Sequence, residues 1–189
     1  YKVTEANDFM IDVCVIGLGY IGLPTAVVAA KSGLKVVGFD INSDLIEAIN
    51  SQSFELTEPG LLDDLNKQMG LGNLVVSDKV TAASVFVVCV PTPVDFEQNV
   101  GKPNLNYVYS AIQTIISVLH EEALIIIEST CPVGTTNKIY DLVRDKRADL
   151  EKISVAYCPE RILPGNALFE IVQNSRIIGG VDSKSSLKA

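Results

Sequence analysis

A glycine-rich segment, GLGYIG at residues 17–22, constrains the fold of this chain more than any other feature of its sequence. It follows directly on the apolar run 13–16, which has the composition of a buried strand, and it opens a helical pattern over 21–32. The first glycine permits a tight turn, the second allows a close approach to the backbone, and the third lets the helix pack closely on the strand. The segment therefore predicts the strand, turn and helix that begin a βαβ unit.

Apolar runs alternate with helical patterns along the rest of the chain. Further runs rich in Val and Ile cover 35–39, 74–76, 85–90, 124–127 and 154–157, and helical patterns cover 43–51, 60–69, 107–119 and 136–147. Nearly continuous apolarity is typical of strands that are covered on both faces in a parallel sheet. The alternation predicts an α/β fold with a doubly wound, mostly parallel sheet, a Rossmann-like domain over 11–180. Its right-handed crossovers would bring the ends of the first and fourth strands side by side.

The last part of the chain, after Pro159, follows this alternation less closely. We expect one further strand at 176–178. The polar sequence VDSKSSLKA at 181–189 resembles the first turns of a helix without its continuation. We therefore expect residues 181–189 to begin a helix that leads into a second domain.

Asp40 ends the second predicted strand, at the separation from the glycines where dinucleotide-binding folds place an acidic residue. There it would accept hydrogen bonds from the adenosine ribose hydroxyls, and it would repel a 2′-phosphate. Ile41, Asn42 and Ser43 bring no positive charge, so NAD is favoured over NADP as the cofactor. Two alternatives stay open: the glycines form only a turn and Asp40 caps the helix near Ser43, or the site binds FAD or another dinucleotide.

The charge, the apolar runs and the cysteines argue against several classes of partner. The 23 acidic and 15 basic residues give a net charge of −8, and an acidic surface repels nucleic-acid phosphates. No apolar run is long enough to span a membrane, and the first residues lack a signal-peptide pattern. The four cysteines form no CxxC pair and are typical of reduced thiols, so we expect a cytoplasmic protein. No spacing of His, Cys and Asp suggests a metal site.

Three clusters of polar and small residues follow later strands of the predicted sheet. They are VPTP at 90–93, ESTCPVGT at 128–135 and YCPERILPG at 157–165. Because the carboxyl ends of parallel strands meet at one edge of a sheet, we expect the chemistry of this protein at that edge.

These clusters belong to a series of seven motifs, VIGLGYIGLP, GFDIN, TEPGL, CVPTP, ESTCPVGTT, YCPERILPG and IIGG, in this order. With them the chain resembles the UDP-glucose/GDP-mannose dehydrogenase family from about residue 11 to 180. ESTCPVGTT and YCPERILPG are most similar to the branch that oxidises UDP-N-acetylamino sugars. The resemblance implies an NAD-dependent UDP-sugar 6-dehydrogenase, which converts the C6 alcohol of a UDP-N-acetylmannosamine-like sugar to the carboxylate with two NAD.

The resemblance also implies roles for individual residues. Glu160 would help to move protons, and Thr130 would position the water that hydrolyses a thioester intermediate. The segment Arg161, Ile162 and Leu163, together with Glu160, would line the sugar-nucleotide site. The expected cofactor-binding residues are Gly17, Gly19, Tyr20, Ile21, Gly22, Asp40, Pro91, Thr92, Ser129 and Thr130.

Parts of the family's machinery have no counterpart in this sequence. The catalytic cysteine of the family lies in a GGxC-type motif, and its catalytic Lys and Asn lie on a central helix; none of these motifs occurs here. Cys131 and Cys158 belong to other motifs and do not replace that cysteine. We therefore expect this chain to bind NAD without completing the oxidation, and we expect the full-length enzyme to form a homodimer.

Less specific interpretations stay open beside the family resemblance. Glu160 could be a carboxylate at a helix start after Pro159, and Thr130 could cap the helix that follows Gly134, a role compatible with water positioning. For the whole chain, the alternatives are a one-step β-hydroxyacid-type NAD dehydrogenase and a noncatalytic NAD-binding module.

Overall fold

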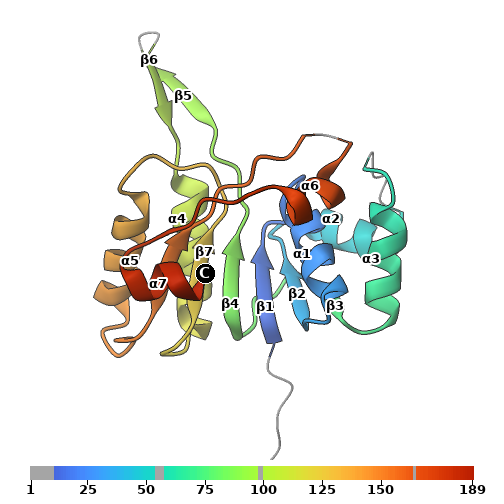
Figure 1. Cartoon of the computed structure of the whole chain (residues 1–189), viewed down its shortest axis with the longest axis horizontal. Coiled ribbons are helices and arrows are strands. Elements are labelled where there is room, and N and C mark those ends of the chain that lie inside the picture. Colours follow the sequence, from blue (N-terminus) through green and yellow to red (C-terminus); the bar gives the residue numbers. More distant parts are fainter. Residues whose placement is uncertain (1–10, 54–57, 98–99, 164) are drawn as a thin grey trace, which may run out of the picture.

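The computed structural model describes residues 11–53, 58–97, 100–163 and 165–189, and they build one central sheet with helices on both faces (Figure 1). The sheet has seven strands in the order β3-β2-β1-β4-β7-β8-β9. All neighbouring pairs are parallel except β8 and β9, which are antiparallel. The strands are β1 (Ile11–Ile16), β2 (Val36–Phe39), β3 (Leu74–Ser77), β4 (Ala83–Val88), β7 (Leu124–Ile127), β8 (Ser154–Tyr157) and β9 (Gly179–Gly180).

The helices divide between the two faces according to the alternation of side chains along the strands. Val13 and Val15 of β1 point to the core beneath the first helices, and Cys14 and Ile16 point to the other core. Helices α1 (Gly22–Lys31), α2 (Ser43–Asn50) and α3 (Leu61–Gly70) contribute to the first core. Helices α4 (Asn106–Ile115) and α5 (Thr135–Lys146) contribute to the second, with the 3₁₀ turn η1 (Ile116–Val118) between them.

The predicted fold class is confirmed, and most predicted elements are present. The strands at 124–127 and 154–157 have the predicted bounds. The five predicted helices and the other four predicted strands differ from their predicted bounds by a few residues at most. Strands β1 and β4 pair from Ile11↔Ala83 to Ile16↔Val88, so their carboxyl ends lie side by side as expected. The sequence therefore predicts correctly that the ends of these two strands meet at one edge of the sheet.

The strand predicted at 176–178 is wrong. These residues form no strand; the sheet is extended instead by Gly179–Gly180, which pairs with Tyr157 and Ala156. The side chain of Arg176 turns toward the sheet edge, where it pairs with two carboxylates, and Ile177 is exposed. The segment whose apolar residues suggested a strand is thus anchored to the sheet edge by the ion pairs of Arg176.

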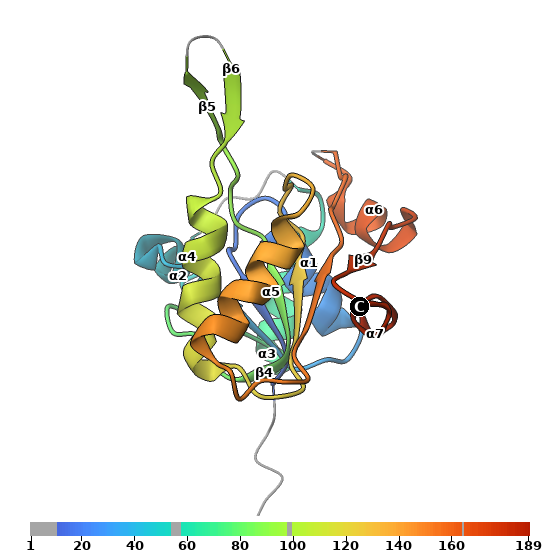
Figure 2. The ribbon, with the colours of Figure 1, turned by 90° about the vertical axis from the view of Figure 1, so that its left-hand side faces the viewer.

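Besides β9, three further elements of the described residues were not predicted. Strands β5 (Val94–Glu97) and β6 (Val100–Pro103) form a separate antiparallel hairpin, which stands away from the domain in two perpendicular views (Figures 1 and 2). Helix α6 (Ala167–Gln173) lies beside α1 on the edge of the domain.

The polar tail forms helix α7 (Ser183–Lys188), as its pattern predicted. Asp182 caps it, because its Oδ1 accepts a hydrogen bond of 2.6 Å from the amide of Ser185. Helix α7 packs on β8 and β9 of the same sheet. That a second domain begins at residue 181 stays a prediction. Of the helices in the described ranges, none is long and apolar enough to cross a membrane.

Candidate functional site

The glycine segment forms the turn between β1 and α1, and its glycines have different physical roles. Gly17 has φ +92°, and a Cβ there would lie 2.7 Å from the carbonyl oxygen of Cys89. A Cβ on Gly22 would lie 1.8 Å from the carbonyl oxygen of Gly17, so both positions require glycine for packing. A Cβ on Gly19 would meet nothing within 4 Å. The turn is therefore tightly packed on its protein side and open at Gly19, which fits a cofactor pyrophosphate at the start of α1.

Asp40 lies at the end of β2 and faces this turn. Its Oδ2 accepts a hydrogen bond from the amide of Leu18 at 2.8 Å, and its Oδ1 accepts one from the amide of Asn42 at 2.9 Å. The N-cap of α2 is Asn42, whose side-chain oxygen accepts from the amides of Asp44 and Leu45. The alternative that Asp40 caps this helix is therefore wrong. Each carboxylate oxygen still has acceptor capacity for a ribose hydroxyl.

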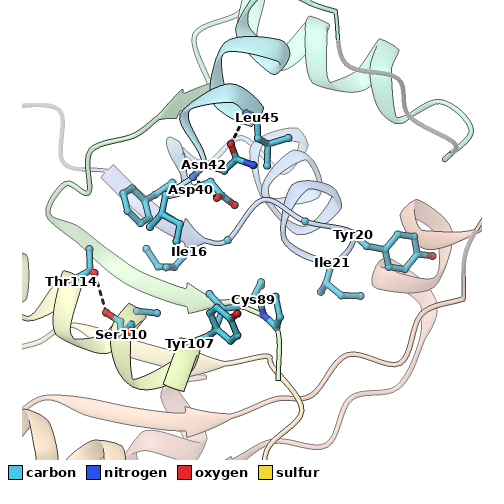
Figure 3. Close-up of a pocket in the computed structure, with 17 residues that line it drawn as sticks. Ile16, Tyr20, Ile21, Asp40, Asn42, Leu45, Cys89, Tyr107, Ser110 and Thr114 are labelled. Atoms are coloured by element: carbon cyan, nitrogen blue, oxygen red, sulfur yellow. Dashed lines mark hydrogen bonds between the residues drawn. The ribbon is translucent and has the colours of Figure 1, made fainter. Parts of the chain in front are cut away.

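A cavity of about 510 Å³ opens between the glycine turn, the end of β2 and the start of α4 (Figure 3). Its size lies within the range of small-molecule sites. The predicted cofactor residues that line it are Gly17, Gly19, Tyr20, Ile21, Asp40 and Pro91. The structure thus brings most of the expected cofactor residues around one cavity, in an arrangement that fits a dinucleotide.

The other four predicted cofactor residues do not line this cavity. Gly22 is buried beneath the turn, and Thr92 is half-buried beyond Pro91. The hydroxyl of Ser129 donates to the carbonyl oxygens of Val90, at 2.7 Å, and Val88, at 3.2 Å, and so ties the end of β7 to the end of β4. Thr130 is exposed at the start of the loop to α5.

Helix α5 has Gly134 as its N-cap and no side-chain cap. Thr130 therefore does not cap it, and that alternative is wrong. The water-positioning role of Thr130 stays a prediction.

The cavity has lining residues that the sequence did not single out. Helix α4 contributes Tyr107, Ser110 and Thr114, which Figure 3 shows opposite Asp40 and Asn42. The helical pattern itself was predicted. Which of its faces reaches the sheet edge depends on the path of the chain through the β5–β6 hairpin, and that path has no signal in the sequence.

A cluster of charged side chains occupies the same edge of the sheet at β7 and β8. The cation is the guanidinium of Arg176, whose Nη1 lies 2.6 Å from Oε1 of Glu128. Its Nη2 pairs with Oε2 of Glu160. Both glutamate side chains are only 3% exposed. Neither Glu128 nor Arg176 was predicted as a site residue.

Glu160 follows β8 directly and is fixed by two donors. Its Oε1 accepts a hydrogen bond of 2.7 Å from the amide of Arg161, while Oε2 meets Arg176. The next helix, α6, begins only at Ala167. The alternative that Glu160 is a carboxylate at a helix start is therefore wrong.

Hydrogen bonds to residues 170–175 of the same chain hold the segment that is predicted to line the sugar-nucleotide site. The guanidinium of Arg161 donates to the carbonyl oxygen of Ser175 at 3.1 Å, and the amide of Leu163 donates to Glu170 at 2.8 Å. Ile162 is half-buried. Further along, the buried carboxylate of Glu58 accepts hydrogen bonds from the amides of Gly165, at 2.8 Å, and Ala167.

The cysteines near this edge are free thiols. Burial raises the pKa of Cys89, and the Glu128 carboxylate that accepts its hydrogen bond at 3.0 Å raises it further. Burial also raises the pKa of Cys131 to about 11. Because the thiolate is the nucleophile, a raised pKa makes Cys131 a poor substitute for a catalytic cysteine at neutral pH.

The mostly parallel sheet, the glycine turn at the switch between β1 and β4, and Asp40 at the end of β2 define a Rossmann-type dinucleotide-binding domain. The sequence model of the UDP-glucose/GDP-mannose dehydrogenase family, NAD binding domain, matches residues 11–189. The chain belongs to this family and is its NAD-binding domain.

Relatives and solved structures agree with this assignment. The chain is 48% identical over 183 residues to a UDP-N-acetyl-D-mannosamine dehydrogenase of Methanocaldococcus jannaschii, covering 96% of this chain and 42% of the relative. It is 46% identical over 175 residues to one of Methanococcus vannielii, covering 92% and 40%. The structure of UDP-D-ManNAc dehydrogenase from Pyrococcus horikoshii superposes with a TM-score of 0.88 at 42% identity, covering 94% of this chain and 43% of that one. The chain therefore spans about two fifths of the length of these relatives.

Proposed function

We propose that this domain works in a UDP-sugar 6-dehydrogenase, which oxidises the C6 alcohol of a UDP-N-acetylmannosamine-like sugar to the carboxylate with two NAD. The observation that carries the proposal is the common location of the cavity at Asp40 and the buried carboxylate of Glu160 on one sheet edge. The identity to enzymes named UDP-N-acetyl-D-mannosamine dehydrogenase supports the choice of sugar. In this proposal the full-length enzyme is a cytoplasmic homodimer.

The cofactor site follows from the geometry of the turn. The open space at Gly19 would accept the pyrophosphate, and Asp40 would hold the adenosine ribose. Gly17, Gly22, Tyr20 and Ile21 would shape the turn around it. Pro91, Thr92, Ser129 and Thr130 would lie toward the nicotinamide. NAD, when bound, supplies the hydride acceptor for the oxidation.

The proton chemistry would belong to the neighbouring cluster. Glu160 is buried, paired with Arg176 and fixed by the amide of Arg161, as a base for an alcohol or a water must be oriented. Thr130 would position the hydrolytic water. Arg161, Ile162 and Leu163 would line the sugar-nucleotide site. The cysteine for the second oxidation is not one of the four in this sequence, so this chain alone would bind NAD without oxidising the sugar.

The test uses the full-length gene product with UDP-N-acetylmannosamine, and with UDP-N-acetylglucosamine as the matched substrate. We expect two NADH for each UDP-N-acetylmannosamine consumed. One NADH for each sugar would favour a one-step dehydrogenase and overturn the four-electron oxidation. No NADH with either sugar would leave a noncatalytic NAD-binding module as the function.

A further inference from the structure

Arg176 stands between two buried carboxylates that come from neighbouring strands. Glu128 ends β7, Glu160 follows β8, and the guanidinium of Arg176 contacts both. Arg176 itself belongs to neither strand; it lies in the segment between α6 and β9. One positive charge is therefore shared by two negative charges at the sheet edge, and the local balance is one excess negative charge.

Glu128 also contacts residues on the cofactor side of the domain. Oε2 of Glu128 accepts hydrogen bonds from Thr25 of α1, at 3.1 Å, and from the thiol of Cys89, at 3.0 Å. Thr25 lies on the helix that begins at the glycine turn, and Cys89 follows β4. Oε2 of Glu128 thus contacts the helix that follows the glycine turn, while Oε1 pairs with Arg176.

We propose that Arg176 is a positioning residue whose guanidinium pairs with Glu160 and holds its carboxylate in one orientation for proton transfer at the sheet edge. This inference rests on the proposed function, which assigns the proton transfer to Glu160. The observation behind it is separate, because the ion pair is a contact between two side chains of this domain.

Electrostatics supports an effect of the Arg176–Glu160 ion pair on proton chemistry over a purely structural contact. We call this ion pair the Arg176 clamp. A carboxylate with 3% exposure cannot be ionised at low cost unless a cation compensates for the lost solvation. The charges of Glu128 and Glu160 and the hydrogen bonds of Arg176 outweigh the effect of its own burial, and the pKa of Arg176 lies above its usual range. Arg176 therefore stays charged at any pH at which the protein is folded.

Orientation is fixed at both oxygens of Glu160. Arg176 contacts Oε2, and the amide of Arg161 donates to Oε1. Oε2 is fully buried, so the acceptor position that stays available for a substrate hydroxyl or a water is on Oε1. The titratable groups that face Glu160 are Arg176, Glu128 and Cys89, and the thiol of Cys158 lies beside Arg176 at 3.8 Å.

The direct test is a carbon-13 NMR titration of the glutamate carboxyls in this chain, with the Glu160 signal assigned by its loss in Glu160→Gln. In Arg176→Met, removal of the cation should raise the midpoint of Glu160 by about 1–3 pH units. Arg176→Lys should keep it close to the wild-type value. Glu128→Gln removes a neighbouring negative charge and should lower it. A matched control is Arg144→Met on α5, which should leave the midpoint unchanged.

Opposite shifts in two variants cannot come from a loss of packing alone. An unchanged midpoint in Arg176→Met, or a rise in Glu128→Gln, would overturn the proposal. If circular dichroism shows that Arg176→Met does not fold, the other two variants still test the proposal. A lowered Glu160 midpoint in Glu128→Gln together with a near wild-type midpoint in Arg176→Lys would support it, and a raised midpoint in Glu128→Gln would overturn it.

The second readout is the pH profile of kcat/KM in the full-length enzyme. The acidic limb should move to higher pH in Arg176→Met and to lower pH in Glu128→Gln, with Arg176→Lys close to wild type. If the wild-type enzyme oxidises no UDP-sugar, the proposed function fails while the NMR shifts can still confirm the clamp. NMR shifts without any movement of the acidic limb would show that the clamp does not serve catalysis, and would overturn the inference.

Discussion

The carboxylate of Asp40 and the amide of Leu18 are joined by a hydrogen bond of 2.8 Å, which couples the end of β2 to the glycine turn. The contact crosses from one strand to the turn after its neighbour, so the protein's own backbone holds the carboxylate of Asp40 in place. A preorganised acceptor of this kind loses little conformational entropy on binding a ligand.

Replacement of Asp40 by Ala should weaken NAD binding, because the ribose hydroxyls lose a charged acceptor. We expect a loss of about 1–3 kcal/mol, or roughly 5- to 150-fold in Kd, by calorimetry on this chain. Affinity for NADP relative to NAD should rise, because the carboxylate no longer repels a 2′-phosphate. Asp44→Ala is the matched control: Asp44 is exposed on α2, and its loss changes the net charge equally. Equal effects of both substitutions would contradict the assigned role of Asp40.

Gly19 and Gly22 should respond to alanine in different ways, although they belong to the same turn. A Cβ on Gly22 would meet the carbonyl oxygen of Gly17 at 1.8 Å, so Gly22→Ala should destabilise the fold by about 1–3 kcal/mol or more. In thermal melts this corresponds to about 2–4 °C per kcal/mol. Gly19→Ala meets no protein atom within 4 Å and should melt near the wild-type temperature.

The same Gly19→Ala variant should bind NAD at least about tenfold more weakly, because its methyl group would occupy the space for the pyrophosphate. Calorimetry with NAD measures this effect. Normal NAD binding by Gly19→Ala would show that the turn does not hold the pyrophosphate there.

The fold was predictable because its signal is local. Strands such as β7, with the sequence LIII, carry their burial in their own composition, and the glycine turn specifies how the first strand connects to α1. The β5–β6 hairpin lacks such a signal: Phe96 is 75% exposed, and the hairpin packs on neither core. Helix α6 has only seven residues, ALFEIVQ, too few to show a clear helical period.

The candidate site was predictable only in part, for a related reason. Asp40 and the glycines follow from spacing along one βαβ unit. The partner of Glu160 is Arg176, which comes from a separate segment after α6 and which the apolar residues beside it suggested to be part of a strand. Contacts between strand ends and distant loops depend on side-chain charge and on the path of the chain, and no local pattern encodes them.

Glu58 should stabilise the segment that leads into α6. Its buried carboxylate accepts from the amides of Gly165 and Ala167, so Glu58→Ala leaves these donors without their partner and should cost about 1–3 kcal/mol. Thermal denaturation of this chain measures the loss. Glu47→Ala is the control, because Glu47 is exposed on α2 and its removal should change the melting temperature little. Equal melting temperatures for the two variants would refute the role of Glu58.

The thiol of Cys131 should react slowly at neutral pH, because burial raises its pKa from 9.0 to about 11. The folded state then binds the proton more tightly than the unfolded state. The resulting stabilisation is fully present below pH 9.0 and is lost as the pH rises through about 11. At pH 8 the thiolate fraction falls from roughly one tenth to roughly one thousandth. Iodoacetamide labelling of the Cys131 peptide, followed by mass spectrometry, should therefore be about 100-fold slower in the folded chain than in guanidinium.

The pH dependence of that labelling separates the pKa effect from simple shielding. A raised pKa predicts that the rate of the folded chain increases about tenfold per pH unit up to about pH 11, whereas the rate in guanidinium levels off near pH 9. Shielding alone would slow the reaction by a constant factor at every pH. A folded-state rate that levels off near pH 9 would therefore contradict the raised pKa of Cys131, and with it the argument that this thiol is unsuited to nucleophilic catalysis at neutral pH.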